Sequence, residues 1–134
     1  MASVLYTPYG LRLGTIIATW IGPVEHFGFV CGYTAWGEPI IASISMRAGY
    51  TEVPLTRFAE AQGKYTCDYP SSLSEYEVLA RAYSVANEPY NLTTWNCEHF
   101  VRYAHKLPLQ SPQVARAALV AFAAVAIVAL SRAA

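Results

Sequence analysis

The stretch Asn96-Cys97-Glu98-His99-Phe100-Val101 places a cysteine where a predicted helix begins. We expect this helix to cover residues 96–106, because Pro108 follows and cannot continue it. Positions i, i+3, i+4 and i+7 on one face of the helix hold four small or apolar residues: Cys97, Phe100, Val101 and Ala104. The thiol therefore points the same way as the buried side of the helix.

A cysteine in the first turn of a helix lies near the positive end of the helix dipole and near free backbone N–H groups, which lower the pKa of its thiol. The thiolate that results is the form that acts as a nucleophile. A lone cysteine on an apolar helix face is, however, more often a small core residue. Spacing alone therefore makes Cys97 a candidate nucleophile and leaves the core interpretation open.

A thiol nucleophile needs a base, and the chain has three histidines, His26, His99 and His105. His99 follows Cys97 by two residues, about 200° around a helix, and cannot easily reach the thiol. His105 lies about two turns beyond Cys97 and is expected to be exposed to solvent. His26 lies on a strand against which the helix would pack, so it is the candidate general base. The alternative is a half-buried strand histidine that bonds to a backbone carbonyl.

The amino-terminal half of the chain is predicted to form a small antiparallel sheet. Period-two patterns bounded by Gly and Pro predict strands over residues 10–21, 25–32, 40–45 and 51–55, followed by a short helix over 55–62. Alternation along the second strand places His26, Gly28 and Val30 on one face and Phe27, Phe29 and Cys31 on the other.

A longer helix is predicted over residues 71–87, where apolar side chains recur at helical spacing before Pro89. Two serine–glutamate pairs match a capping box at its start, Ser72 with Glu75 and Ser74 with Glu77. Sheet and helices together indicate an α+β domain.

Two motifs resemble the lecithin:retinol acyltransferase-like family and its small phospholipase A/acyltransferase branch. The first is Asn-Cys-Glu-His-Phe-Val at 96–101, preceded by Glu-Pro-Tyr-Asn-Leu-Thr-Thr-Trp at 88–95; it looks like the nucleophile motif of that family. The second is His-Phe-Gly-Phe-Val-Cys-Gly at 26–32, which is similar to the family's first histidine box. The motifs occur in the family's order, and the resemblance extends over residues 11–107.

The resemblance implies a circularly permuted papain-like fold in which Cys97 is the nucleophile and His26 its base. The family's third position, which orients the imidazole, falls on Ser43, with Ser45 as the second choice, because the third strand has no histidine. The implied reaction is attack of the Cys97 thiolate on a lipid ester, followed by transfer of the acyl group from the thioester to water, an amine or an alcohol. A phospholipid or another acyl lipid is the implied substrate.

Residues 114–130 are apolar except for Arg116, and Ser111-Pro112 is typical of a helix start. A helix over 112–131 would be about 30 Å long, which matches the hydrocarbon core of a bilayer. We therefore divide the chain into a domain at 1–109 and a single-pass membrane anchor at 112–131, with a helix in an oligomer core as the alternative. Residues 1–8 show no feature of a secretory signal, so the domain is expected on the cytoplasmic side.

Composition narrows the functional classes further. Nine Lys and Arg balance nine Asp and Glu, so no basic surface for nucleic acid is expected. The three cysteines follow no metal-ligand spacing, and we expect neither a metal nor a cofactor. Two alternatives to a lipid acyltransferase stay open, a cysteine peptidase or amidase of the permuted papain type and a catalytically weak membrane-binding module.

Overall fold

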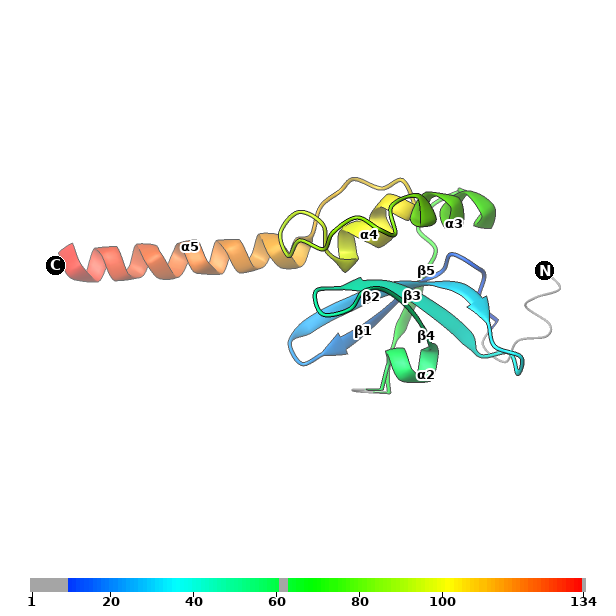
Figure 1. Ribbon diagram of the computed structural model, residues 1–134. Helices are drawn as coiled ribbons and strands as arrows, with labels where there is room; N and C mark the ends of the chain where they lie inside the picture. Colours follow the sequence, from blue (N-terminus) through cyan, green and yellow to red (C-terminus); the bar gives the residue numbers. More distant parts are fainter. Residues whose placement is uncertain (1–9, 61–62, 134) are drawn as a thin grey trace.

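The computed structural model describes residues 10–60 and 63–133, so the amino-terminal segment examined for a secretory signal lies outside the described residues. The chain forms an antiparallel sheet of five strands in the order β4-β3-β2-β1-β5, with helices and a long carboxyl-terminal helix (Figure 1). The strands are β1 (Ile16–Ile21), β2 (Val24–Tyr33), β3 (Pro39–Ser45), β4 (Gly49–Pro54) and β5 (Thr66–Asp68). The helices are α2 (Leu55–Phe58), α3 (Glu75–Ser84), α4 (Cys97–Ala104) and α5 (Pro112–Ala133). The predicted α+β class is confirmed.

Tight turns join the first four strands into a meander. Ile21 pairs with Val24, so Gly22 and Pro23 alone form the turn between β1 and β2. Gly22 adopts a φ of 60°, a conformation that favours glycine and suits a two-residue hairpin turn. Ser45 pairs with Gly49, which leaves residues 46–48 to turn β3 into β4.

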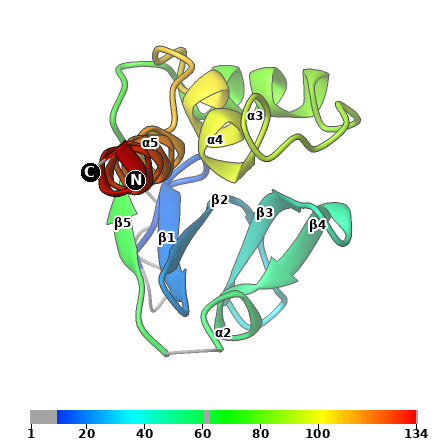
Figure 2. The same ribbon diagram turned by 90° about the vertical axis from the view of Figure 1, so that its left-hand side faces the viewer.

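The two faces of the sheet carry separate apolar clusters. Helices α3 and α4 cover one face, and the short helix α2 lies on the other (Figures 1 and 2). The cluster beneath α3 and α4 includes Phe29, Ile44, Val78, Phe100 and Val101. The cluster beside α2 is formed by Ile17, Val30, Ile41, Leu55 and Phe58. Alternation along β2 therefore sends Phe29 toward α4 and Val30 toward α2, as the period of two predicts.

Several boundaries differ from the sequence prediction. Strand β5 was not predicted, because its three residues are all exposed and show no apolar alternation. The predicted helix 55–62 is α-helical only over α2, and residues 61–62 lie outside the described residues. Helix α3 begins after Ser74, whose hydroxyl accepts a hydrogen bond from the Glu77 amide, so the second of the two proposed capping boxes marks the start.

Helix α5 leaves the domain and extends away from it as a single straight element (Figure 1). Its segment Pro112–Arg132 is long and apolar enough to cross a membrane, and none of its most apolar window is buried within the chain. Two contacts fix its first turn to the domain. Ser111 donates a hydrogen bond to Glu98 of α4, and the Gln113 side chain binds both backbone groups of Glu25.

Candidate functional site

Cys97 is the first residue of α4, and its position depends on the cap that precedes it. The Asn96 side-chain oxygen accepts hydrogen bonds from the backbone amides of Glu98 and His99, at 3.0 and 3.2 Å. In return, His99 Nδ1 accepts the Asn96 amide proton at 3.0 Å. This reciprocal capping box satisfies amides that a helix start would otherwise leave without partners. The sequence prediction missed the part of His99, because Glu or Gln usually takes that position.

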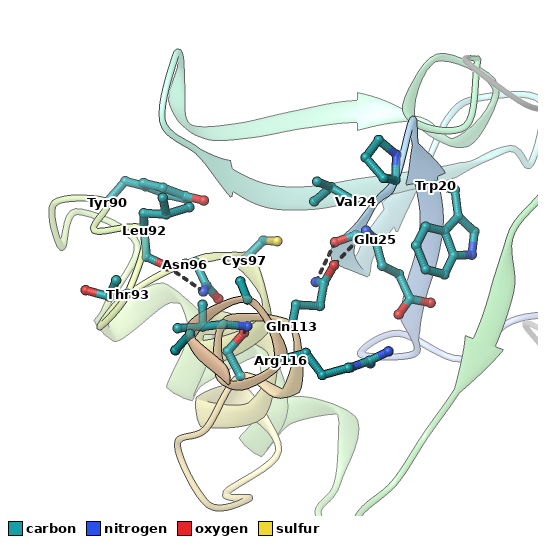
Figure 3. A pocket seen from close by; sticks show the side chains of 15 residues that line it. Trp20, Val24, Glu25, Tyr90, Leu92, Thr93, Asn96, Cys97, Gln113 and Arg116 are labelled. Atoms are coloured by element: carbon teal, nitrogen blue, oxygen red, sulfur yellow. Dashed lines mark hydrogen bonds between the residues drawn. The ribbon is translucent and has the colours of Figure 1, made fainter. Parts of the chain in front are cut away.

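Cys97 lines a cavity of ≈ 510 Å³ (Figure 3). The cavity lies between the β1–β2 hairpin, the loop before α4 and the first turns of α5. The thiol points into the space between Tyr90 and Val24 (Figure 3). Apolar side chains form much of the wall: Trp20, Pro23, Val24, Tyr90, Leu92, Val114, Ala117 and Ala118. A cavity of this size and character suits an apolar ligand.

The thiol of Cys97 is protonated in this environment. Only 7% of the residue is exposed, and burial raises the pKa of the thiol because it disfavours the charged form. The neighbouring Glu98 carboxylate raises this pKa further, while backbone hydrogen bonds, chiefly from Phe27, act in the opposite direction. The effect expected from the helix start is therefore outweighed by burial.

The structure does not bring His26 to Cys97. Phe27, the next residue along β2, packs in the cluster that contains Cys97 and Phe100. The His26 ring points the other way and stacks on Phe58 of α2, with 5.0 Å between the ring centroids. The two candidate catalytic side chains thus lie on opposite faces of β2, because neighbouring residues of a strand face opposite ways. The expected Cys97–His26 pair is absent from the described residues, and burial lowers the pKa of His26.

His26 does lie close to the serines proposed to orient it. His26, Ser43 and Ser45 line one cavity of ≈ 270 Å³, together with Arg57 and Glu60. Ser43 is buried on β3 and faces the same side as His26. The structure therefore brings the predicted base and its predicted partners together, on the face that carries α2 instead of α4.

The expectation that His105 is exposed is wrong. Only 1% of His105 is accessible, and its ring bridges two distant segments of the chain. Nε2 lies 2.7 Å from the Gly14 carbonyl oxygen, and Nδ1 lies 2.6 Å from the Ser71 hydroxyl. A carbonyl can only accept, so Nε2 carries the proton and Nδ1 accepts from Ser71. The ring is a structural link between α4 and the segments before β1 and α3.

No protein-family model matches the chain, and no curated protein matches it significantly. Within residues 10–60 and 63–133, no group of three or more His, Cys, Asp or Glu side chains is placed to hold a metal ion. The functional interpretation therefore depends on the two motifs and on the geometry around Cys97.

Proposed function

We propose that this chain is a membrane-anchored, cysteine-dependent enzyme that transfers or hydrolyses the acyl group of a lipid ester through a thioester on Cys97. One observation carries the proposal: a thiol at the start of a helix lines an apolar cavity, and the first turns of a helix long enough to span a membrane form one wall of that cavity. The anchor would keep the domain beside its lipid substrate, on the cytoplasmic face of the membrane.

The chemistry assigns one role to each group near the thiol. Cys97 Sγ attacks the ester carbonyl carbon, the alcohol portion of the lipid leaves with a proton, and the acyl group stays on sulfur until an acceptor removes it. The backbone amide of Cys97 lies in the first turn of α4, where an intrahelical partner is lacking, so it is the candidate donor to the oxyanion. Water, an amine or an alcohol would each complete the cycle.

Removal of the proton from the Cys97 thiol by His26 requires an arrangement of these two side chains different from the one in this structure. We propose that the active state brings His26 and Cys97 together and that the present arrangement, in which they lie on opposite faces of β2, is the resting state.

A lipid-binding module without turnover is the second candidate. The observation that favours it is the placement of His26 and Cys97 on opposite faces of β2, which leaves the buried thiol protonated. Such a protein would hold an acyl chain in the cavity and release it unchanged.

The deciding experiment incubates the full chain with acyl-labelled phosphatidylcholine and follows both the lipid products and the intact mass of the protein. We expect free fatty acid and lysolipid, with an added acyl group on Cys97 that neutral hydroxylamine removes. Cys97→Ser should lower the rate by about 10³-fold or more, as expected for loss of a nucleophile. Cys67→Ser is the matched control, because Cys67 is exposed and lies on β5.

The outcomes separate the candidate functions. Equal turnover in the Cys97→Ser variant would contradict the proposal. Binding of lipid without turnover would support the module, and cleavage of an amide or isopeptide substrate without lipid turnover would support a peptidase. Loss of turnover in His26→Gln with intact lipid binding would show that His26 reaches the thiol in the active state.

The ionisation of Cys97 provides a separate prediction. Burial raises the pKa of both thiols, but Cys97 is only 7% exposed whereas Cys67 is exposed, so iodoacetamide should label Cys97 more slowly than Cys67 at pH 7.5, and the Cys97 rate should climb as the pH is raised past 9. Peptide mass spectrometry of the lipid-free chain in detergent measures both rates. Rapid labelling of Cys97 near neutral pH would reveal a thiolate with a cationic partner and would refute the resting state described above.

A further inference from the structure

Three segments lie level with the start of α5, at the end of the domain from which that helix leaves (Figure 1). They are residues 20–24 around the β1–β2 turn, residues 46–48 between β3 and β4, and residues 90–95 before α4. Each of them exposes large apolar side chains: Trp20, Ile21, Val24, Met46 and Leu92. We refer to these three segments as the membrane-facing end.

The membrane-facing end is fixed to α5 by hydrogen bonds. Gln113, in the first turn of α5, accepts from the Glu25 amide at 2.8 Å and donates to the Glu25 carbonyl at 2.9 Å. These bonds join the start of α5 to the strand that follows the β1–β2 turn. The hairpin tip therefore keeps its position relative to a helix that would cross the bilayer.

The cavity beside Cys97 opens at this same end. Trp20, Val24 and Leu92 are exposed and also line the cavity, so they form its rim. On the side of the cavity formed by α5, the wall is completed by Arg116 and Ala117. A ligand that enters past this rim comes from the direction in which α5 extends.

We propose that the membrane-facing end contacts the bilayer, with Trp20 in the interfacial region, so that the cavity opens directly into lipid. The partner is a phospholipid surface, and the inference depends on the proposed role of α5 as a membrane anchor. Trp is favoured at the boundary between headgroups and acyl chains because its ring is apolar and its N–H is polar. Arg47 in the 46–48 turn and Arg116 carry charges that complement lipid phosphates.

The membrane-facing end lies level with the start of α5, and this favours a bilayer over a second copy of this chain as the partner that covers it. A helix that spans the membrane brings any surface level with its first turn to the headgroup region, whatever the oligomeric state. Exposed apolar side chains at that level then become buried without another protein. A lipid acyl chain could pass from the bilayer to Cys97 without crossing water.

Two exposed tryptophans provide the test and its control. Trp20 is 46% exposed at the membrane-facing end, whereas Trp36 is 75% exposed in the β2–β3 turn at the opposite end of the domain (Figure 1). The full chain, Trp20→Phe and Trp36→Phe, each with the partly buried third tryptophan, Trp95, replaced by Phe, are reconstituted into phosphatidylcholine vesicles, with and without lipid brominated on its acyl chains. Both substitutions are at exposed positions, so folding is expected to survive them, and flotation of the vesicles reports insertion.

We expect bromolipid to quench tryptophan emission in the full chain and in Trp36→Phe, and most of this quenching to be lost in Trp20→Phe. Aqueous iodide should show the reverse dependence. Equal bromolipid quenching of the two variants in vesicles that float would overturn the inference and leave the anchor standing. Protection of Trp20 from both quenchers would overturn it in favour of a contact between copies.

The inference and the proposed function fail in distinguishable ways. A chain that does not float with vesicles refutes the anchor, and the inference is refuted with it. A chain whose Trp20 is quenched by bromolipid but whose Cys97 is never acylated supports the inference and contradicts the proposed catalysis.

Discussion

Gly28 lies on β2 at a point where the neighbouring strand leaves no room for a methyl group. A Cβ built there would be 2.6 Å from Ile41 Cγ2 and 2.7 Å from the Ala42 carbonyl oxygen. Gly28→Ala should therefore lower the free energy of unfolding by about 1–3 kcal/mol, the usual cost of overpacking. Denaturant titration of the chain in detergent measures the change.

Gly32, four residues further along the same strand, is the matched control. A Cβ at Gly32 would meet no described atom within 4 Å, and its φ does not lie in the left-handed region. Gly32→Ala should be neutral or slightly stabilising, because alanine restricts the unfolded chain. Equal losses for the two substitutions would show that β2 is packed differently from the structure.

Single residues also show where prediction from sequence succeeded and where it did not. Alternation correctly separated His26 and Gly28 from Phe27 and Phe29 on β2. Phe27 and Phe29 pack on the α4 face in the structure, so His26 faces away from the cysteine on that helix. Both the position of His26 on a strand beneath the helix and the family resemblance favoured the pairing, and alternation alone did not show which face of β2 meets α4. His105 was mispredicted because its partners, Gly14 and Ser71, come from segments that no local pattern connects to it.

Helix α3 provides a test at the level of a single element. Ser74 accepts the Glu77 amide at 3.1 Å, whereas Ser72 is exposed ahead of the helix. Ser74→Ala should lower the free energy of unfolding by about 1 kcal/mol, a usual value for loss of an N-cap. Ser72→Ala should change it little. Thermal denaturation followed by circular dichroism compares the two, and a larger loss for Ser72→Ala would place the start of the helix earlier.

Elements with their own apolar period were predictable, and elements defined by long-range pairing were not. Strands β2 and β3 alternate clearly and were predicted with small errors in their boundaries. Strand β5 is only Thr66–Asp68, exposed throughout, and exists because it pairs with β1. Helix α4 was predicted, but the cavity beside it combines three separate segments, so no local pattern showed it.

At the scale of the whole molecule, the sheet separates two environments that the sequence alone could not assign. The α4 face holds Cys97 and the cavity that adjoins α5, and the α2 face holds His26 with Ser43. A catalytic cycle that uses both Cys97 and His26 must bring the two side chains to one face, whereas a lipid-binding cycle needs only the first face. The strand between them is thus the element on which the two candidate functions differ.

Acidification is expected to destabilise the entire domain, because three histidines are neutral in the folded chain. Burial lowers the pKa values of His26, His99 and His105 below the ordinary value of 6.5. Below about pH 6.5 the unfolded chain therefore binds protons that the folded chain does not, and the free energy of unfolding falls until the folded histidines are also protonated. Denaturant titration of the full chain in detergent at pH 7.5 and pH 5.5 should show this loss. His105→Gln, whose amide can still donate to Gly14 and accept from Ser71, should show a smaller difference between the two pH values. An unchanged free energy of unfolding in the original chain across this range would contradict the buried, neutral state of the histidines.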